Sequence, residues 1–161
     1  MSPRLFLLIV LAAFLAPAAQ FPLAAAGPED DIAIVAHPGV PVQNLSMSEI
    51  RQIFMGDRQY WNTNLRITLL VRAPVARERD VVLKTIYQMT EAQFRQYWIG
   101  KVFRAENTSG PKIVYSSETA SELVLNIPGS ITFLSASQVP KGAKVLKANG
   151  LLPGEKGYPL R

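Results

Sequence analysis

Arginines in the middle of the sequence have the type and spacing needed to hold a small oxyanion. Arg72 ends an apolar stretch that predicts a strand, and Arg77 and Arg79 follow at the predicted start of a helix. A planar guanidinium can donate two parallel hydrogen bonds to an oxyanion, and the free N–H groups of a helix start can add to them. The alternative is that these arginines form ion pairs with the carboxylates of nearby acidic residues, namely Glu78, Asp80 and Glu91.

Two adjacent serines could supply hydroxyl donors to the same ligand. Ser116 and Ser117 stand at the predicted start of a later helix. Capping of that helix by a serine oxygen accounts for both residues without any ligand, and we favour it over a binding role. The candidate oxyanion-binding residues are Arg72, Arg77, Ser116 and Ser117.

Catalytic, metal and cofactor chemistry find no support in the residue pattern. His37 is the only histidine, and no carboxylate is placed by the sequence to orient it as a base. The sequence has no nucleophile elbow, zinc-protease, phosphate-loop or dinucleotide-binding motif. Trp61, Tyr97 and Trp98 could face a ligand, although packing in the core explains them equally. We therefore expect a binding protein, with no catalytic residue, metal site or cofactor.

The elements that must position these residues are organised around residues 45–61. Ser46 and Glu49 form a capping box that predicts a helix start, and Gly56 supplies the stop. The helix between them has one apolar stripe, made by Ile50, Ile53 and Phe54.

Strands and helices alternate along the rest of the chain. Apolar runs predict strands over 31–36, 65–72, 113–115, 131–134 and 143–147, and helical periodicity covers 76–89, 90–101 and 116–127. This alternation predicts a three-layer α/β domain, with a mainly parallel sheet between helices. Ligands of such sheets bind beyond the carboxyl ends of the strands, which here are Ala36, Arg72, Tyr115 and Leu134.

The first 26 residues have the features of a secretory signal peptide. Arg4 is followed by an uncharged apolar stretch and by small residues up to Ala26, and the stretch is short for a membrane span. We expect cleavage after Ala26, with a site near Ala18 or Ala19 as the alternative, and a periplasmic domain over residues 27–161. The absence of cysteine excludes a lipid-attachment site, disulfide bonds and thiol catalysis.

The net charge favours small anionic partners over nucleic acid. The formal charge of +5 falls to +4 when Arg4 leaves with the signal peptide. A modest basic excess on an exported protein suits a small anion or an anionic membrane surface. Basic runs with interleaved aromatic residues are absent, so we expect no nucleic-acid partner.

The order of residue types in residues 45–61, Leu-Ser-x-x-Glu-Ile-x-x-Ile-Phe-x-Gly with a following Trp, resembles a segment of periplasmic substrate-binding proteins of phosphate ABC transporters. The likeness extends over residues 32–158, including Arg72 and the Pro-Gly-Ser-Ile turn at 128–131. It implies one lobe of a type II periplasmic binding protein, and it implies phosphate or a related small oxyanion as ligand. An ABC-type transporter or another periplasmic protein is the partner that it suggests.

Three departures from that family leave a second hypothesis open. The family has two lobes, and it places Ser-Gly-Thr shortly after the arginine that matches Arg72, where this chain has Ala-Pro-Val-Ala-Arg at 73–77. Its Gly-Tyr pair also becomes Thr132-Phe133. The alternative function is therefore a ligand-free structural or regulatory interaction protein that retains the fold.

Overall fold

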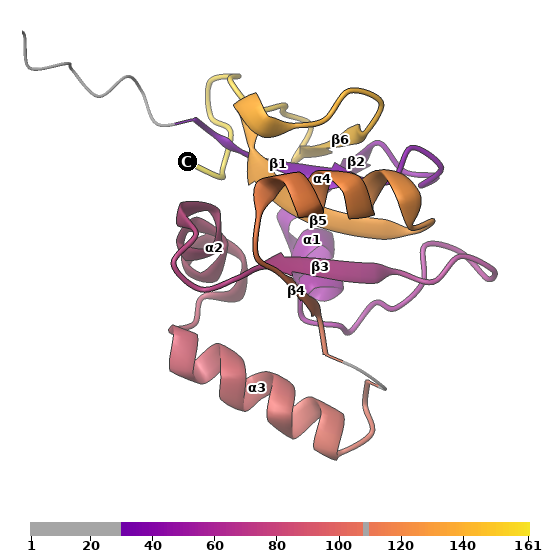
Figure 1. The fold of residues 1–161 in the computed structure, drawn as a ribbon, viewed down its shortest axis with the longest axis vertical. Helices are drawn as coiled ribbons and strands as arrows, with labels where there is room; N and C mark the ends of the chain where they lie inside the picture. Colours follow the sequence, from indigo (N-terminus) through magenta and orange to yellow (C-terminus); the bar gives the residue numbers. More distant parts are fainter. Residues whose placement is uncertain (1–29, 108–109) are drawn as a thin grey trace, which may run out of the picture.

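A computed structural model describes residues 30–107 and 110–161 of the chain. These residues form one mixed sheet between helical layers (Figure 1). The strand order is β2-β6-β1-β5-β3-β4. The strands are β1 (Ile32–Ala36), β2 (Asn44–Leu45), β3 (Thr68–Arg72), β4 (Lys112–Val114), β5 (Ser130–Ser135) and β6 (Lys144–Ala148). The predicted signal peptide lies outside the described residues, and within them no helix is long and apolar enough to cross a membrane.

The sheet is mainly parallel, as predicted, but its central strand β1 runs against the others. β1 pairs antiparallel with both β5 and β6, whereas β3 pairs parallel with β4 and β5. Ala36 lies opposite Ile131 and Lys144, at the amino ends of β5 and β6. The prediction that Ala36 shares an edge with Arg72 is therefore wrong. The physical reason is that the direction of β1 is set by its antiparallel backbone pairing with β5 and β6, which lie far along the chain and leave no local signal.

Helix α1 (Met47–Phe54) forms as its capping box predicts. The Oγ atom of Ser46 accepts the Glu49 N–H at 3.2 Å, and the Glu49 carboxylate accepts the Ser46 N–H at 2.8 Å. Gly56 follows with a φ of 71°, and a Cβ atom there would lie 2.7 Å from the Trp98 ring. Both the backbone conformation and the lack of space require glycine at this position.

The next helical segment changes its winding before it ends. Helix α2 (Arg77–Val82) continues as a π-helical turn, η1 (Leu83–Tyr87), where a single α-helix over 76–89 is predicted. Gln88 ends it in the left-handed conformation, with a φ of 55°. Helix α3 (Glu91–Phe103) then begins with the predicted capping box of Thr90 and Gln93.

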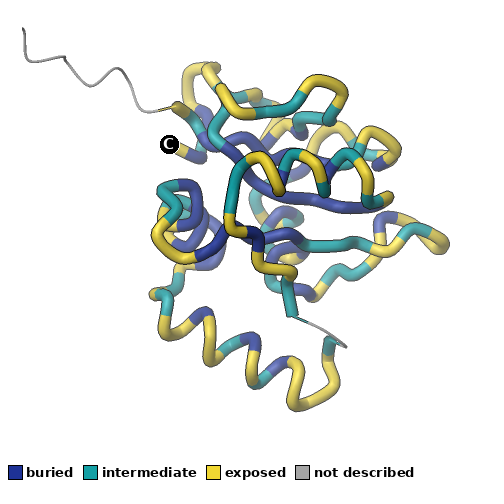
Figure 2. Tube along the Cα trace, viewed as in Figure 1, coloured by how far each residue is buried: buried dark blue, intermediate teal, exposed yellow. Residues whose placement is uncertain are grey.

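Helices cover the sheet on both faces, as the α/β prediction requires (Figure 1). The larger core joins α1, η1 and α3 to one face through Phe54, Tyr87, Phe94 and Phe133. The smaller core packs α4 (Ser117–Asn126) against the other face. A 3-10 turn, η2 (Ala136–Gln138), follows β5. Figure 2 shows that buried residues concentrate in the sheet, whereas α3 is exposed over much of its length.

The C-terminal tail has no long element, but it is part of the core. Its buried residues are Tyr158 and Leu160. The Tyr158 hydroxyl donates to the carbonyl of Ile32 at 2.7 Å, and the carbonyl of Leu160 accepts the Ile32 N–H at 2.8 Å. The tail thereby supports the start of β1.

Candidate functional site

The carboxyl ends of β3, β4 and β5, together with the starts of α2 and α4, form what we call the carboxyl edge. Arg72 is the last residue of β3 and lies opposite Val114, the last residue of β4. Ser116 and Ser117 begin α4 directly after β4, and Arg77 begins α2 after the loop that follows β3. The parallel pairing of β3 and β4 thus brings Arg72 and the two serines to neighbouring strand ends.

Arg72 is a buried arginine with few partners. Only 7% of the residue is exposed. One Nη atom donates to the carbonyl of Val114 at 3.3 Å, and that carbonyl already accepts the Ala73 N–H at 2.8 Å. The Nε atom is buried without a hydrogen-bond partner, and within the described part of the chain no carboxylate pairs with the guanidinium. Such a group lowers its free energy when an anion supplies the missing acceptors.

Arg77 contacts the chain that enters β1. One of its Nη atoms donates to the carbonyl of Asp30 at 2.9 Å. This bond ties the start of α2 to the segment before β1, so Arg77 has a structural contact in addition to its place on the carboxyl edge. A ligand would have to compete with that contact or to extend it.

The two serines have partners within the protein. The Oγ atom of Ser116 accepts the Thr119 N–H at 3.0 Å, so Ser116 caps α4 as the alternative interpretation predicts. The Ser117 hydroxyl lies 2.9 Å from the side-chain oxygen of Gln138 and donates to it. Both serines lie at the start of α4, and both side chains already have hydrogen-bond partners within the protein.

Arg79 has a different role from the one that its position in the sequence suggests. Its guanidinium is 2.8 and 2.7 Å from the two carboxylate oxygens of Glu91, and it donates to the carbonyl of Arg72 at 2.6 Å. It also stacks 4.6 Å from the ring centre of Phe94. The hydrogen bonds from Arg79 lower the pKa of Glu91. Arg79 therefore joins the end of β3 to the start of α3, which is the ion-pair alternative.

Two buried polar residues near these strands carry no signal in the sequence. Glu78 is only 7% exposed in the first turn of α2, and its carboxylate is 3.5 Å from the Ser135 hydroxyl at the end of β5. Thr132 is fully buried in β5, and its hydroxyl has no hydrogen-bond partner. Glu78 lies in a charged run that is typical of an exposed helix start, and only the packing of α2 against β5 buries it.

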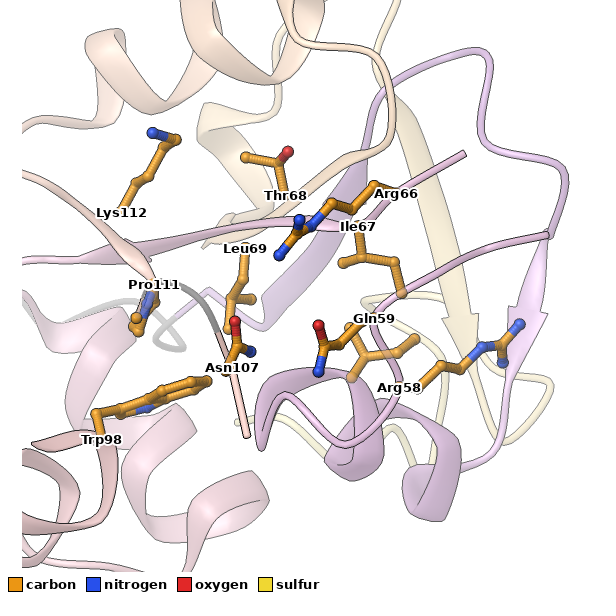
Figure 3. Close-up of a pocket in the computed structure, with 12 residues that line it drawn as sticks. Arg58, Gln59, Arg66, Ile67, Thr68, Leu69, Trp98, Asn107, Pro111 and Lys112 are labelled. Atoms are coloured by element: carbon orange, nitrogen blue, oxygen red, sulfur yellow. The ribbon is translucent and has the colours of Figure 1, made fainter. Parts of the chain in front are cut away.

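A concave region lies at the opposite, amino edge of the sheet (Figure 3). This cleft encloses about 530 Å³, including the solvent at its mouth, between α1, α3 and the starts of β3 and β4. Its cationic lining residues are Arg58, Arg66 and Lys112. Figure 3 shows Arg58 and Lys112 on opposite sides of the opening, so their charges do not converge on one point. None of the predicted site residues lines the cleft.

Metal binding is not indicated by the side chains that the structure places. Among residues 30–107 and 110–161, no group of three histidine or carboxylate side chains could hold a metal ion. The chemistry that the carboxyl edge can offer is hydrogen bonding to an anion.

Solved structures with a similar fold are phosphate receptors. A candidate phosphate ABC transporter substrate-binding protein from Clostridium perfringens, solved with bound phosphate, is 21% identical with a TM-score of 0.61, and the match covers 76% of this chain and 46% of that one. An ABC-type phosphate transport receptor from Vibrio cholerae is 19% identical, with a TM-score of 0.61 and coverages of 77% and 48%. PstS from Borrelia burgdorferi is 16% identical, with a TM-score of 0.64 and coverages of 81% and 54%.

These comparisons confirm the fold that the sequence resemblance implies. The chain has the architecture of one lobe of a type II periplasmic binding protein, and it spans about half the length of the phosphate receptors that it matches. A scan against models of protein families finds no match, and neither does a comparison with curated protein sequences.

Proposed function

We propose that this chain, whose fold is that of one lobe of a type II periplasmic binding protein, binds phosphate or a related small oxyanion at the carboxyl edge. The observation that carries the proposal is the state of Arg72. This arginine is buried and keeps an Nε donor without an acceptor, and it has no carboxylate partner in the described chain. An oxyanion is the ligand that would satisfy it by two parallel hydrogen bonds.

The other predicted site residues take secondary roles in this proposal. The Ser116 oxygen accepts a backbone N–H and lies 2.9 Å from the Thr119 hydroxyl. When Thr119 is the donor of that pair, the Ser116 O–H can donate to a bound oxygen. Ser117 would have to exchange its bond to Gln138 for one to the ligand. Arg77 adds positive charge at the mouth of the site while it remains bonded to Asp30. Affinity then depends chiefly on Arg72.

We propose that the protein is exported to the periplasm and that it functions there together with a membrane transporter. The N-terminal segment predicts a signal peptide, and three proteins of similar fold are phosphate-transport or phosphate-binding proteins by their descriptions. We therefore propose a periplasmic binding module linked to ABC-type phosphate transport, without enzymatic activity. Fractionation of expressing cells should recover a species that lacks residues 1–26 from the periplasm, and full-length protein in the membrane fraction would contradict this.

A specific observation favours the second candidate, a ligand-free interaction protein. The Ser116 oxygen caps α4 and the Ser117 hydroxyl donates to Gln138, so both predicted serine donors are satisfied without a ligand. A module that retains the fold without a ligand would bind a protein partner, and it would give no response to anions.

Calorimetric titration separates the two candidates. The protein over residues 27–161 is titrated with phosphate and, separately, with sulfate, at constant ionic strength set by chloride. Saturable heat with phosphate is expected if Arg72 holds an oxyanion. A titration without saturable heat up to about 1 mM, equivalent to binding weaker than roughly −4 kcal/mol, would support the ligand-free alternative.

A further inference from the structure

Helix α3 carries an exposed apolar stripe on the side that faces away from the sheet. Ile99 is 64% exposed, Val102 is 40% exposed and Phe103 is 90% exposed. Phe94 and Trp98 are buried on the adjoining face, and Trp98 borders the stripe, where it lines a shallow apolar hollow with Ile99, Val102 and Phe103. Spacings of three and four residues place the exposed side chains on one face of the helix. Figure 2 shows that exposed residues recur along α3, with buried ones between them.

The stripe cannot turn inward, because α3 is tied to the body by polar contacts along its length. Arg79 holds Glu91 in the first turn. The Tyr97 hydroxyl donates to the carbonyl of Met55 at 2.8 Å, and the Lys101 ammonium donates to the Tyr97 hydroxyl at 3.0 Å and pairs with Asp57. Three exposed apolar residues on a fixed helix form a surface that is stabilised when another molecule covers it.

We propose that a second copy of this chain covers the stripe, with the two α3 helices packed antiparallel about Ile99. A two-fold axis through Ile99 brings each residue that lies four positions before it next to the residue that lies four positions after it on the other copy. Arg95 therefore meets Phe103 of the other copy, and Gln96 meets Val102 by the same symmetry. Ile99 packs against its own copy in the centre.

The stripe is self-complementary in chemistry as well as in spacing. Arg95 is exposed one turn before Ile99, and Phe103 exposes its ring one turn after it. A guanidinium attracts the face of an aromatic ring, so the antiparallel arrangement gains two equivalent cation–π contacts around an apolar centre. A two-fold interface needs one patch that matches itself, and this patch does so.

An anionic membrane surface suits the stripe less well. Such a surface favours basic residues on both flanks of the apolar patch. At the C-terminal flank Arg104 pairs with the carboxylate of Glu106, with an Nη–O distance of 3.4 Å for the longer of its two contacts. The flank is therefore neutralised. The dimer involves α3 alone and does not depend on anion binding by Arg72.

Sedimentation equilibrium of the protein over residues 27–161 tests the proposal. The wild type should show a concentration-dependent monomer–dimer equilibrium. R95E loses the cation, and F103K places a cation opposite Arg95, so each variant should raise the dimer Kd by about tenfold or more. An equimolar mixture of R95E and F103K should restore dimerisation, because it forms one Glu–Lys contact and keeps one Arg–Phe contact in each heterodimer.

A matched control and two contrary outcomes complete the test. Leu152 is an exposed apolar residue, 37% exposed, in the chain that follows β6, and L152K should leave the dimer Kd unchanged. Circular dichroism should confirm that all variants are folded. A wild type that stays monomeric up to about 1 mM overturns the proposal. A monomer that instead sediments with phosphatidylglycerol vesicles also overturns it, and would make the stripe a membrane contact.

Discussion

Two buried arginines, Arg72 and Arg79, stand on either side of the loop between β3 and α2, and their surroundings differ sharply. Arg79 is 2% exposed and has acceptors for all of its nitrogen atoms, from Glu91 and from the carbonyl of Arg72. Arg72 is 7% exposed and has one carbonyl at 3.3 Å and an unsatisfied Nε. The same residue type is buried in both places, but the residues that the structure describes compensate only one of the two charges.

The comparison shows that burial alone does not separate a structural arginine from a binding one. A buried charge must be compensated, either by the protein itself or by a ligand. Arg79 is compensated before any ligand arrives, so its removal should damage the fold. Arg72 is not, so its removal should damage binding. Four predictions follow that distinction from the largest expected effect to the smallest.

Arg79→Ala should destabilise the protein most. The substitution removes both hydrogen bonds to the Glu91 carboxylate and the hydrogen bond that Arg79 donates to the carbonyl of Arg72. It also leaves a void beside Phe94. Because Arg79 is buried but the Glu91 side chain is 34% exposed, loss of this pair and of the packing on Phe94 costs about 2 kcal/mol, which corresponds to a fall in melting temperature of roughly 7 °C. Thermal unfolding followed by circular dichroism measures it. An unchanged melting temperature would show that Arg79 is not a structural clamp.

Arg72→Lys should weaken anion binding although it keeps the charge. Lysine cannot reproduce the two parallel hydrogen bonds of a guanidinium. The loss of one charge-assisted hydrogen bond, about 1.5–3 kcal/mol, lowers phosphate affinity roughly ten- to a hundredfold. Calorimetric titration of the variant and the wild type gives the ratio. Unaltered affinity together with a large fall in melting temperature would make Arg72 structural and the proposed site wrong.

Arg72→Met should separate binding from stability. Methionine is apolar and similar in length, so it removes a charge that the protein does not compensate, and the protein should keep its stability or gain about 1 kcal/mol. Phosphate binding should disappear in the same variant. Chemical denaturation and titration of one preparation measure both properties. A loss of stability comparable with that of Arg79→Ala would remove the contrast between the two arginines.

The pH dependence of stability should report the Arg79–Glu91 pair. Because the hydrogen bonds from Arg79 lower the pKa of Glu91 in the folded state, the ionised carboxylate stabilises the fold above its unfolded pKa of about 4.3. That contribution is lost as the pH falls through the lower, folded pKa. The stability difference between the wild type and Glu91→Gln should therefore be constant above about pH 5 and should shrink below pH 4 or so. Denaturant unfolding at several pH values measures this difference, and a constant difference down to pH 3 or thereabouts would contradict the pairing.

Local features of the fold could be predicted from the sequence. The capping boxes of Ser46 with Glu49 and of Thr90 with Gln93 form within one helical turn, so neighbouring residues suffice to specify them. The position of Arg72 at the end of a strand also follows from the apolar run before it. The resemblance in residues 45–61 adds the type of fold, which the structural neighbours confirm.

Contacts between distant segments could not be predicted in the same way. The direction of β1 depends on its pairing with β5 and β6, about 100 residues later in the chain. The burial of Glu78 depends on the packing of α2 near the end of β5. The charged residues around Glu78 are typical of an exposed helix start, so the local sequence does not predict this burial. The π-helical turn at Leu83–Tyr87 likewise interrupts a periodic segment that predicts a continuous α-helix.

By itself, the sequence determined where helices begin, which stretches become strands other than the short β2, and that Arg72 stands at a strand end, since these depend on residues a few positions apart. Only the tertiary structure decided which arginine is compensated. Arg79 reaches Glu91 because α3 folds back past the end of β3, whereas Arg72 meets the carbonyl of Val114 because β4 pairs with β3. The free energy of a buried charge depends on every group around it, and those groups come from segments that are distant in the chain.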